Sequence, residues 1–132
     1  MSSHFVIDVA LALVRRQGCI LITRRLKEAH LGGLWEFPGG KRLPGETVEE
    51  CAERETLEEV GVACRPEWVR PVIEFAYPER TVRLYPVECV YLGGPPRPLQ
   101  VAEWAWASPE ELRRYSFPPA NAALLQTLEA GK

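Results

Sequence analysis

The chain has 132 residues, of which 46% are hydrophobic and 26% are charged, and its formal net charge is −2. This length fits one domain, residues 1–132, that buries about two-thirds of the surface its unfolded chain exposes. The slightly acidic balance argues against a general nucleic-acid binder, which usually carries a basic excess. A small phosphate-bearing ligand is still allowed, because a few well-placed arginines are enough to bind it.

We expect a cytoplasmic protein. The start, Met1–His4, lacks the basic and apolar regions of a signal peptide, and the longest apolar run, Val9–Val14, is too short to cross a bilayer. The four cysteines match no zinc or redox spacing, so we interpret them as reduced and partly buried. These are Cys19, Cys51, Cys64 and Cys89.

The first forty residues predict strands separated by turns. Phe5–Val14 and Cys19–Thr23 are apolar and β-rich, and Arg15–Gly18 between them predicts a hairpin turn. After an irregular stretch, Trp35–Phe37 predicts a short strand that enters a turn at Pro38–Gly40.

The clearest helix spans Thr47–Val60. Thr47 and Glu50 form a Thr-x-x-Glu capping box, and Gly61 follows the last turn, where glycine is favoured.

The second half of the chain mixes strands with short helices. Two strands around a turn, a Gly/Pro-rich loop, one further strand and two helices separated by prolines are expected. In chain order these are Trp68–Tyr77, Thr81–Tyr91, the loop 93–98, Val101–Ala107, a capping-box helix from Ser108 and a final helix from Asn121 to Ala130. Hairpins with few helices indicate an α+β fold with a mixed sheet.

Three carboxylates crowd the end of the Thr47–Val60 helix. At about 100° per residue, Glu55, Glu58 and Glu59 fall within roughly a 100° arc, where like charges repel. A solvated acidic face is the usual meaning of such a run. The preceding glycine-rich segment instead favours a hard dication and a phosphate-rich substrate, because Mg²⁺ prefers oxygen ligands and shares its shell with phosphates.

The segment from Gly40 to Val62, with Glu46, Arg54 and Gly61 in register, resembles the Nudix box. The resemblance implies a Nudix-type α/β/α sandwich with a central mixed sheet, and a hydrolase that uses Mg²⁺, with Mn²⁺ as a substitute. It implies Glu55, Glu58, Glu59 and the Gly39 carbonyl as metal ligands, Arg54 as the residue that orients the glutamates, and Glu46 as a support for the loop. Thr56 departs from the pattern, which usually has an aliphatic residue there.

Three further segments look like the MutT branch of that family, namely Leu34–Lys41, Ile22–Arg25 and Phe117–Asn121. This similarity implies hydrolysis of 8-oxo-dGTP to 8-oxo-dGMP and pyrophosphate, and so a role in cleaning the nucleotide pool. The substrate contacts it implies are Arg25, His30, Glu36, Phe37, Pro38, Arg80 and Asn121. Trp35, Trp104 and Trp106 are candidates for a base-pocket wall, although tryptophans at strand spacing more often belong to the core.

Asn121 is the candidate for reading the base. Its carboxamide can donate to O6 and accept from N7–H of 8-oxo-guanine, whereas ordinary guanine presents two acceptors there. A flipped carboxamide fits adenine equally well, and an asparagine at a helix start is also a common N-cap.

The general base is the open point of the mechanism. Gln100 stands where MutT-type enzymes use a glutamate, and a glutamine side chain accepts no proton at neutral pH. Glu103, three residues further on, is the substitute we expect.

Two other functions remain open. One is the same chemistry on another nucleotide, such as a pyrimidine triphosphate, and the other is a non-catalytic domain that senses oxidised guanine. We expect a small-molecule nucleotide as the partner, no nucleic acid, no membrane, and a monomer or weak homodimer.

Overall fold

The computed structural model describes residues 5–129, which form one mixed sheet with helices on both faces. The described strands are β1 (Phe5–Arg16), β2 (Cys19–Arg24), β3 (Trp35–Glu36), β4 (Gly39–Lys41), β5 (Ala63–Val69), β6 (Ile73–Ala76), β7 (Arg80–Gly93) and β8 (Glu103–Ala107). The helices are α1 (Val48–Val60), α2 (Ala122–Glu129) and two short 3₁₀ helices, Pro109–Arg114 and Pro119–Asn121.

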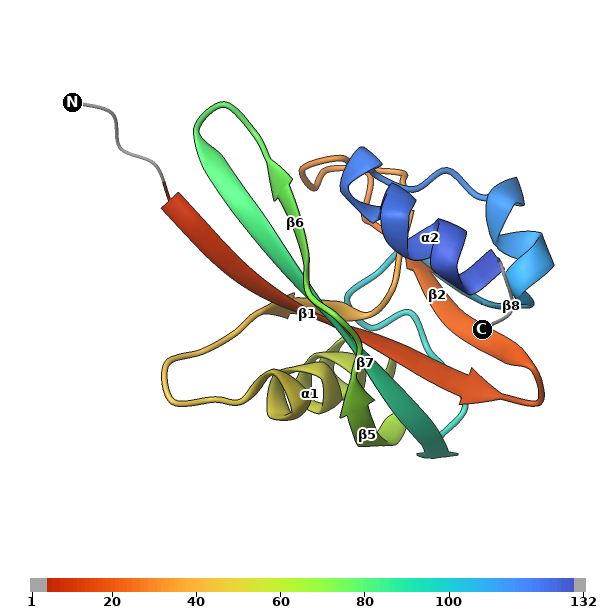
Figure 1. Ribbon diagram of the computed structural model, residues 1–132. Helices are drawn as coiled ribbons and strands as arrows, with labels where there is room; N and C mark the ends of the chain where they lie inside the picture. Colours follow the sequence, from red (N-terminus) through yellow and green to blue (C-terminus); the bar gives the residue numbers. More distant parts are fainter. Residues whose placement is uncertain (1–4, 130–132) are drawn as a thin grey trace.

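The centre of the sheet is the parallel pair β1 and β7. It runs from Phe5 opposite Arg80 to Arg15 opposite Val90, and the other strand pairs are antiparallel. Figure 1 shows α1 and α2 on opposite sides of these crossing strands. The predicted α/β/α sandwich around a mixed sheet is therefore confirmed.

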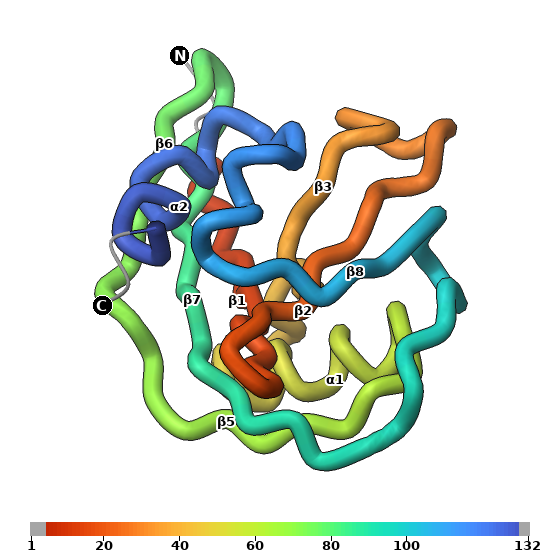
Figure 2. Tube along the Cα trace, turned by 90° about the vertical axis from the view of Figure 1, so that its right-hand side faces the viewer, coloured from red at the N-terminus to blue at the C-terminus, as the bar shows by residue number. Residues whose placement is uncertain are grey.

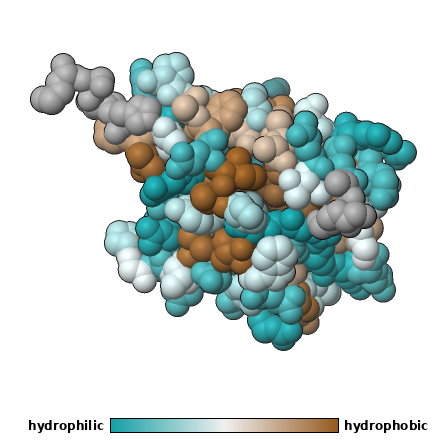
Figure 3. Space-filling model, viewed as in Figure 1, coloured by the Kyte–Doolittle hydropathy of each residue, from teal (hydrophilic) through white to brown (hydrophobic). Residues whose placement is uncertain are grey.

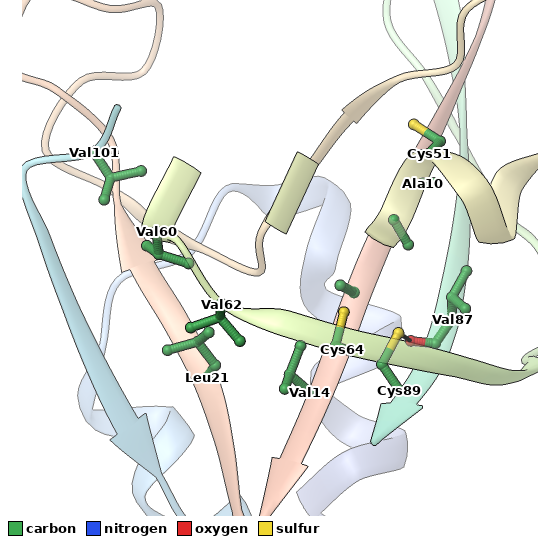
Figure 4. Close-up of a cluster of buried hydrophobic side chains, with 12 residues drawn as sticks. Ala10, Val14, Leu21, Cys51, Val60, Val62, Cys64, Val87, Cys89 and Val101 are labelled. Atoms are coloured by element: carbon green, nitrogen blue, oxygen red, sulfur yellow. Dashed lines mark hydrogen bonds between the residues drawn. The ribbon is translucent and has the colours of Figure 1, made fainter. Parts of the chain in front are cut away.

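Two cores follow from the alternation of side chains along β1. Ala10, Ala12 and Val14 point towards α1, and Leu11 and Leu13 point to the opposite face. Figure 4 shows the α1-side core, which includes Val60 at the end of α1, Leu21 on β2, and Val62 and Val101 from the segments before β5 and β8. The α2-side core contains Ile20, Ile22, Phe37, Leu84, Leu112, Leu124 and Leu128.

Helix α1 begins and ends where the sequence predicts. The Thr47 side chain accepts a hydrogen bond from the Glu50 N–H, and the Glu50 carboxylate accepts one from the Thr47 N–H. Gly61 closes the helix in the left-handed region at φ 71°, and its N–H donates to the Leu57 carbonyl. Thr56 is fully buried and donates to the Ala52 carbonyl, so this departure from the Nudix pattern lies in the core.

Several predicted boundaries were wrong. Residues 68–77 are not one strand, because β5 ends at Val69 and β6 begins at Ile73, with Pro71, which has no N–H to offer a neighbouring strand, between them. The last strand begins at Glu103 rather than Val101, and residues 119–121 form a 3₁₀ turn before α2. Ala130, the predicted end of the last helix, lies outside the described residues.

The predicted turn at residues 38–40 is partly wrong as well. Gly39–Lys41 forms β4, which pairs with β1 through Gly39 opposite Leu11 and Gly40 opposite Ala10.

Aromatic contacts hold the C-terminal segment against β3. The rings of Trp35 and Tyr115 lie 4.8 Å apart and those of Phe37 and Phe117 lie 5.3 Å apart, while the Trp35 N–H donates to the Ser116 carbonyl. In Figure 2 the blue C-terminal segment passes near the β2–β3 region of the sheet. These contacts fix the position of Asn121.

Apolar patches on the face viewed in Figure 1 are separated by polar side chains (Figure 3). Among residues 5–129, no helix combines the length and the apolar character that crossing a membrane requires.

A partly buried ion triplet joins the central pair, β1 and β7, to Arg70, the residue that follows β5. Glu88 on β7 accepts hydrogen bonds from Arg15 at 2.9 and 3.1 Å and from Arg70 at 2.7 Å. Burial by itself would raise the pKa of Glu88, but the hydrogen bonds from Arg15 and Arg70 outweigh it and keep the pKa below its ordinary value of 4.5. The ionised carboxylate therefore stabilises the fold above pH 4.5, and this contribution is lost as pH falls through the lowered pKa.

We predict that Glu88→Gln lowers the free energy of unfolding by about 1–3 kcal/mol at pH 7, because two charged hydrogen-bond donors lose their carboxylate. Urea unfolding at pH 7 and at pH 3.5 measures this, and the difference from wild type should narrow at the lower pH. Glu67→Gln is the control, since Glu67 forms an exposed pair with Arg65 at 3.9 Å and should change stability by less than about 0.5 kcal/mol. An undiminished difference at pH 3.5 would contradict the assigned role of the Glu88 charge.

Candidate active site

A cavity of about 630 Å³ opens beside the glycine strand β4. Its wall combines apolar side chains of β1 and β7 with polar groups from the 25–31 loop, β3, α1 and the start of α2. This mixture is typical of a ligand pocket, in which apolar walls carry a few convergent polar groups. The polar and charged residues that line it are Arg25, His30, Glu36, Lys41, Glu59, Tyr77, Arg80, Gln100 and Asn121, together with the backbone of Gly39 and Gly40.

The two glycines of β4 are required by close approaches of different kinds. A Cβ atom on Gly39 would collide with the Ala10 backbone carbonyl on β1. A Cβ atom on Gly40 would lie 2.6 Å from Oε2 of Glu55, a side chain of α1. Gly39 thus allows the strand to pair, and Gly40 makes room for a carboxylate beside it.

Arg54 holds the carboxylates of α1 against the loop that precedes the helix. Its guanidinium donates to both Glu46 oxygens at 2.6 and 3.0 Å, and it donates to Glu55 and Glu58 at 3.1 Å each. The hydrogen bonds from Arg54 and from the Leu43 N–H lower the pKa of Glu46 to about 2. These bonds fit the predicted roles of Arg54 as orienting residue and Glu46 as loop support.

Glu59 is the helix carboxylate that reaches the pocket wall. The Gly39 N–H donates to its Oε1 at 3.4 Å. Burial, followed by the negative charges of Glu36 and Glu55, raises the pKa of Glu59 to about 9. A carboxyl group in this position gains from a nearby cation, because a positive charge offsets both the burial and the like charges.

The groups near β4 are suitable ligands for a hard dication. The carboxylates of Glu55 and Glu59 and the backbone of Gly39 lie together, and oxygen ligands are what Mg²⁺ prefers. Glu58 turns its half-exposed carboxylate to Arg54. Within residues 5–129 no three acidic, histidine or cysteine side chains are already grouped as a metal centre, and the Arg54 guanidinium lies between Glu55 and Glu58.

Four of the predicted substrate contacts from the loop and strands do line the pocket, namely Arg25, His30, Glu36 and Arg80. Arg25 donates to Glu36 at 2.8 Å and to the His30 carbonyl at 2.6 Å. Burial raises the pKa of Glu36, although Arg25 opposes this rise. The Arg80 guanidinium lies 5.7 Å from the centre of the Tyr77 ring.

Asn121 reaches the same pocket from the 3₁₀ turn just before α2. The residue is 6% exposed, and its side chain makes no hydrogen bond with the described part of the chain. An N-cap role would require its side-chain oxygen to accept a bond from the first turn of α2, and no such bond forms among the described residues. The amide atoms are not fully enclosed, so they stay open to the pocket and can pair with a ligand there.

Besides Arg54, Glu55 and Glu58 of α1, three predicted site residues do not line the pocket. Phe37 is fully buried in the α2-side core, and the Pro38 carbonyl accepts a hydrogen bond from the Ala12 N–H. Glu103 is exposed and pairs with Arg24 at 2.8 Å across β2 and β8. Gln100, whose N–H donates to the Glu59 carbonyl, lies at the wall instead.

The three candidate tryptophans do not line the pocket. Trp35 packs on the α2-side core and Trp106 on the α1-side core, and Trp104 is 36% exposed.

The sequence interpretation missed Lys41, Tyr77 and the apolar wall formed by Ile7, Val9 and Val82. The valines and the isoleucine read only as strand residues. Tyr77 directly follows β6, and its backbone bonds to that of Arg80. Its closeness in sequence to the predicted Arg80 could have indicated that it lines the pocket.

A family model described as the NUDIX domain matches residues 9–127 of the chain. The chain belongs to the NUDIX family. Two curated relatives from Escherichia coli support this assignment over nearly their full lengths. An 8-oxo-dGTP diphosphatase is 32% identical, covering 93% of this chain and 96% of the relative, and a CTP pyrophosphohydrolase is 30% identical, covering 95% and 93%.

Solved structures agree with the NUDIX assignment. The E. coli ORF135 protein superposes with a TM-score of 0.84 at 30% identity, covering 97% of this chain and 91% of that one. A MutT protein from Methanosarcina mazei shares the fold with a TM-score of 0.86 at 24% identity, covering 99% and 98%. As a NUDIX hydrolase, the protein is an enzyme that acts on pyrophosphate bonds.

We predict that Gly40→Ala keeps the fold but weakens Mn²⁺ binding by about tenfold or more, because the new methyl group displaces only the flexible Glu55 carboxylate. Isothermal titration with Mn²⁺ and thermal unfolding measure the two effects. Gly39→Ala provides the contrast, since its methyl group meets backbone and should lower the unfolding midpoint. Wild-type Mn²⁺ affinity in Gly40→Ala would contradict the expected role of Glu55 as a metal ligand.

Proposed function

We propose that this NUDIX hydrolase is a Mg²⁺-dependent nucleoside triphosphate pyrophosphohydrolase that converts 8-oxo-dGTP to 8-oxo-dGMP and pyrophosphate. The observation that carries the proposal is one cavity lined both by the carboxylates of Glu59 and Glu36 and by Asn121, whose side-chain amide makes no hydrogen bond within the described chain. Such a pocket offers separate groups for the phosphates and for a polar base edge.

Glu55, Glu58 and Glu59, with the Gly39 carbonyl, would hold the cation, and Mn²⁺ can take its place. When bound, Mg²⁺ neutralises charge on the phosphates and acidifies water. Arg54 supports these roles, because its bonds to Glu46 and Glu55 fix the helix carboxylates relative to the glycine strand.

Arg25 and Arg80 supply positive charge at the pocket wall for the phosphate and sugar region of a nucleotide. The water that attacks the β-phosphorus must lose a proton. Glu59 lines the pocket and Glu55 adjoins it, so we assign proton acceptance to these helix carboxylates. Glu103, held by Arg24 outside the cavity, is a less suitable base than its sequence position suggested.

Asn121 is proposed to distinguish 8-oxo-guanine from guanine. Its NH₂ group would donate to O6 and its carbonyl would accept from N7–H, a hydrogen that guanine lacks. In a buried pocket, a carbonyl that faces the N7 lone pair instead loses a bond and is repelled.

A pyrimidine triphosphate is the second candidate substrate. It is favoured by the 30% identity to a CTP pyrophosphohydrolase, which nearly equals the 32% identity to an 8-oxo-dGTP diphosphatase. The carboxamide of Asn121 can present either its donor or its acceptor to a different base.

The setting we propose is the cytoplasm. The four cysteines are free thiols, as expected in a reducing compartment. Apolar patches interrupted by polar side chains on the face in Figure 3 fit a monomer or weak homodimer.

We predict that Glu59→Gln lowers kcat for nucleotide hydrolysis by about 100-fold or more, since loss of a cation ligand removes several kcal/mol of transition-state stabilisation. Glu103→Gln is the matched control and should retain activity within about threefold, in line with the small worth of an exposed ion pair. Pyrophosphate release under saturating Mg²⁺ measures both. The assignment fails if Glu59→Gln is as active as wild type.

We predict that wild type prefers 8-oxo-dGTP over dGTP and that Asn121→Ala reduces this preference by about 10- to 100-fold, as expected for one lost buried hydrogen-bond pair. The measurement is kcat/KM for 8-oxo-dGTP, dGTP, dCTP and CTP. Gln126→Ala, which removes an exposed amide from the helix that follows Asn121, is the control. Equal turnover of dCTP and 8-oxo-dGTP by wild type would favour the pyrimidine candidate.

A further inference from the structure

One pocket contains both a permanent cation and a carboxylate that the proposed function assigns to a metal. Arg25 and Glu59 line the same cavity, together with Gly39 and Gly40. An arginine stays protonated at any physiological pH and binds carboxylates through a planar fork of donors. Unless something holds it, Arg25 is therefore a competitor for the oxygens that a divalent cation needs.

Two acceptors hold the Arg25 side chain on the loop side. Its Nη1 donates to Glu36 Oε1 at 2.8 Å and its Nε donates to the His30 carbonyl at 2.6 Å. The backbone is fixed as well, since the Arg25 N–H donates to the Leu34 carbonyl and the Gly33 N–H donates to the Arg25 carbonyl. Of these partners, Glu36 alone carries a charge.

Glu36 stands between the two oppositely charged parts of the pocket. It lies on β3 opposite Thr23 of β2, and its side chain is 21% exposed. Three residues later the chain reaches Gly39, whose N–H contacts Glu59. The negative charge of Glu36 also contributes to the raised pKa of Glu59, so the two carboxylates are near neighbours.

We propose that Glu36 is a positioning residue that holds Arg25 on the loop side of the pocket and so leaves Glu55 and Glu59 available to the divalent cation. The inference rests on the proposed metal-dependent function. It adds a role for Glu36, a third carboxylate beside Glu55 and Glu59. Glu36 acts through Arg25 and need not touch the metal. Arg25 remains aimed at the cavity, where its other guanidinium N–H groups can meet phosphate.

A direct role for Glu36, as a ligand or as a bare negative charge, gives a different pattern of variants. If Glu36 acts through Arg25, neutralising Glu36 matters only while Arg25 is present. If Glu36 acts on the cation itself, neutralising it weakens binding whether Arg25 is present or not. A double-variant cycle separates these two cases.

The experiment measures Mn²⁺ binding to the full chain without nucleotide, by the electron paramagnetic resonance signal of free Mn²⁺. Glu36→Gln should weaken binding roughly tenfold, at the lower end of the effect of groups that orient metal ligands. Arg25→Ala should bind at least as tightly as wild type, and the Arg25→Ala/Glu36→Gln double variant should bind within about twofold of Arg25→Ala. Glu67→Gln, an exposed change of the same charge, should bind like wild type.

A double variant that binds much more weakly than Arg25→Ala would overturn the inference, as would wild-type affinity in a folded Glu36→Gln. If Glu36→Gln alone fails to fold, the comparison of Arg25→Ala with the double variant still decides. Failure of wild type to bind Mn²⁺ would overturn the metal-dependent function itself, together with this inference. Wild-type binding combined with an unchanged Glu36→Gln overturns the inference alone.

Discussion

The guanidinium of Arg54 shared among Glu46, Glu55 and Glu58 is the interaction on which the site depends. It ties the loop before α1 to the acidic end of the helix by bonds of 2.6 to 3.1 Å. Without a positive group, the carboxylates of α1 would repel one another and the helix end would be destabilised. Arg54 therefore allows several carboxylates to lie close together at the end of α1. Their negative charge remains available beside β4 for a divalent cation.

The parts of the fold that the sequence predicted correctly are those set by local chemistry. The capping box at Thr47 and the left-handed Gly61 define α1 without reference to the rest of the chain. Strand β4 was missed because glycines have low strand propensity, and only the close approach of Gly39 to Ala10 explains why they are required there. The division of residues 68–77 at Pro71 was missed because the apolar residues on both sides suggested one continuous strand.

The site divides in the same way. The proposed metal end is contained in one contiguous motif, so its residues could be named from their spacing. The proposed base end is assembled from β1, the β6–β7 turn and the 3₁₀ turn before α2, and Asn121 is held there by the packing of Phe117 on Phe37 and the backbone bond between Trp35 and Ser116. Apolar wall residues such as Ile7 and Val82 carry no signal that separates a pocket wall from a core. Glu103 is only three residues from Gln100 in the sequence, but its ion pair with Arg24 on β2 holds it outside the pocket.

Relatives named for different substrates resemble the chain almost equally. The 32% identity to an 8-oxo-dGTP diphosphatase and the 30% identity to a CTP pyrophosphohydrolase both extend over nearly the whole chain, so overall identity does not separate the two substrates. The choice of base must then lie with groups that can be changed without disturbing Arg54 and its glutamates. Asn121, which lies on a separate element and whose side chain makes no hydrogen bond within the described chain, satisfies that condition. Glu36 does not, because it lies between Arg25 and Glu59, and a change there would alter nucleotide binding and the carboxylate cluster together.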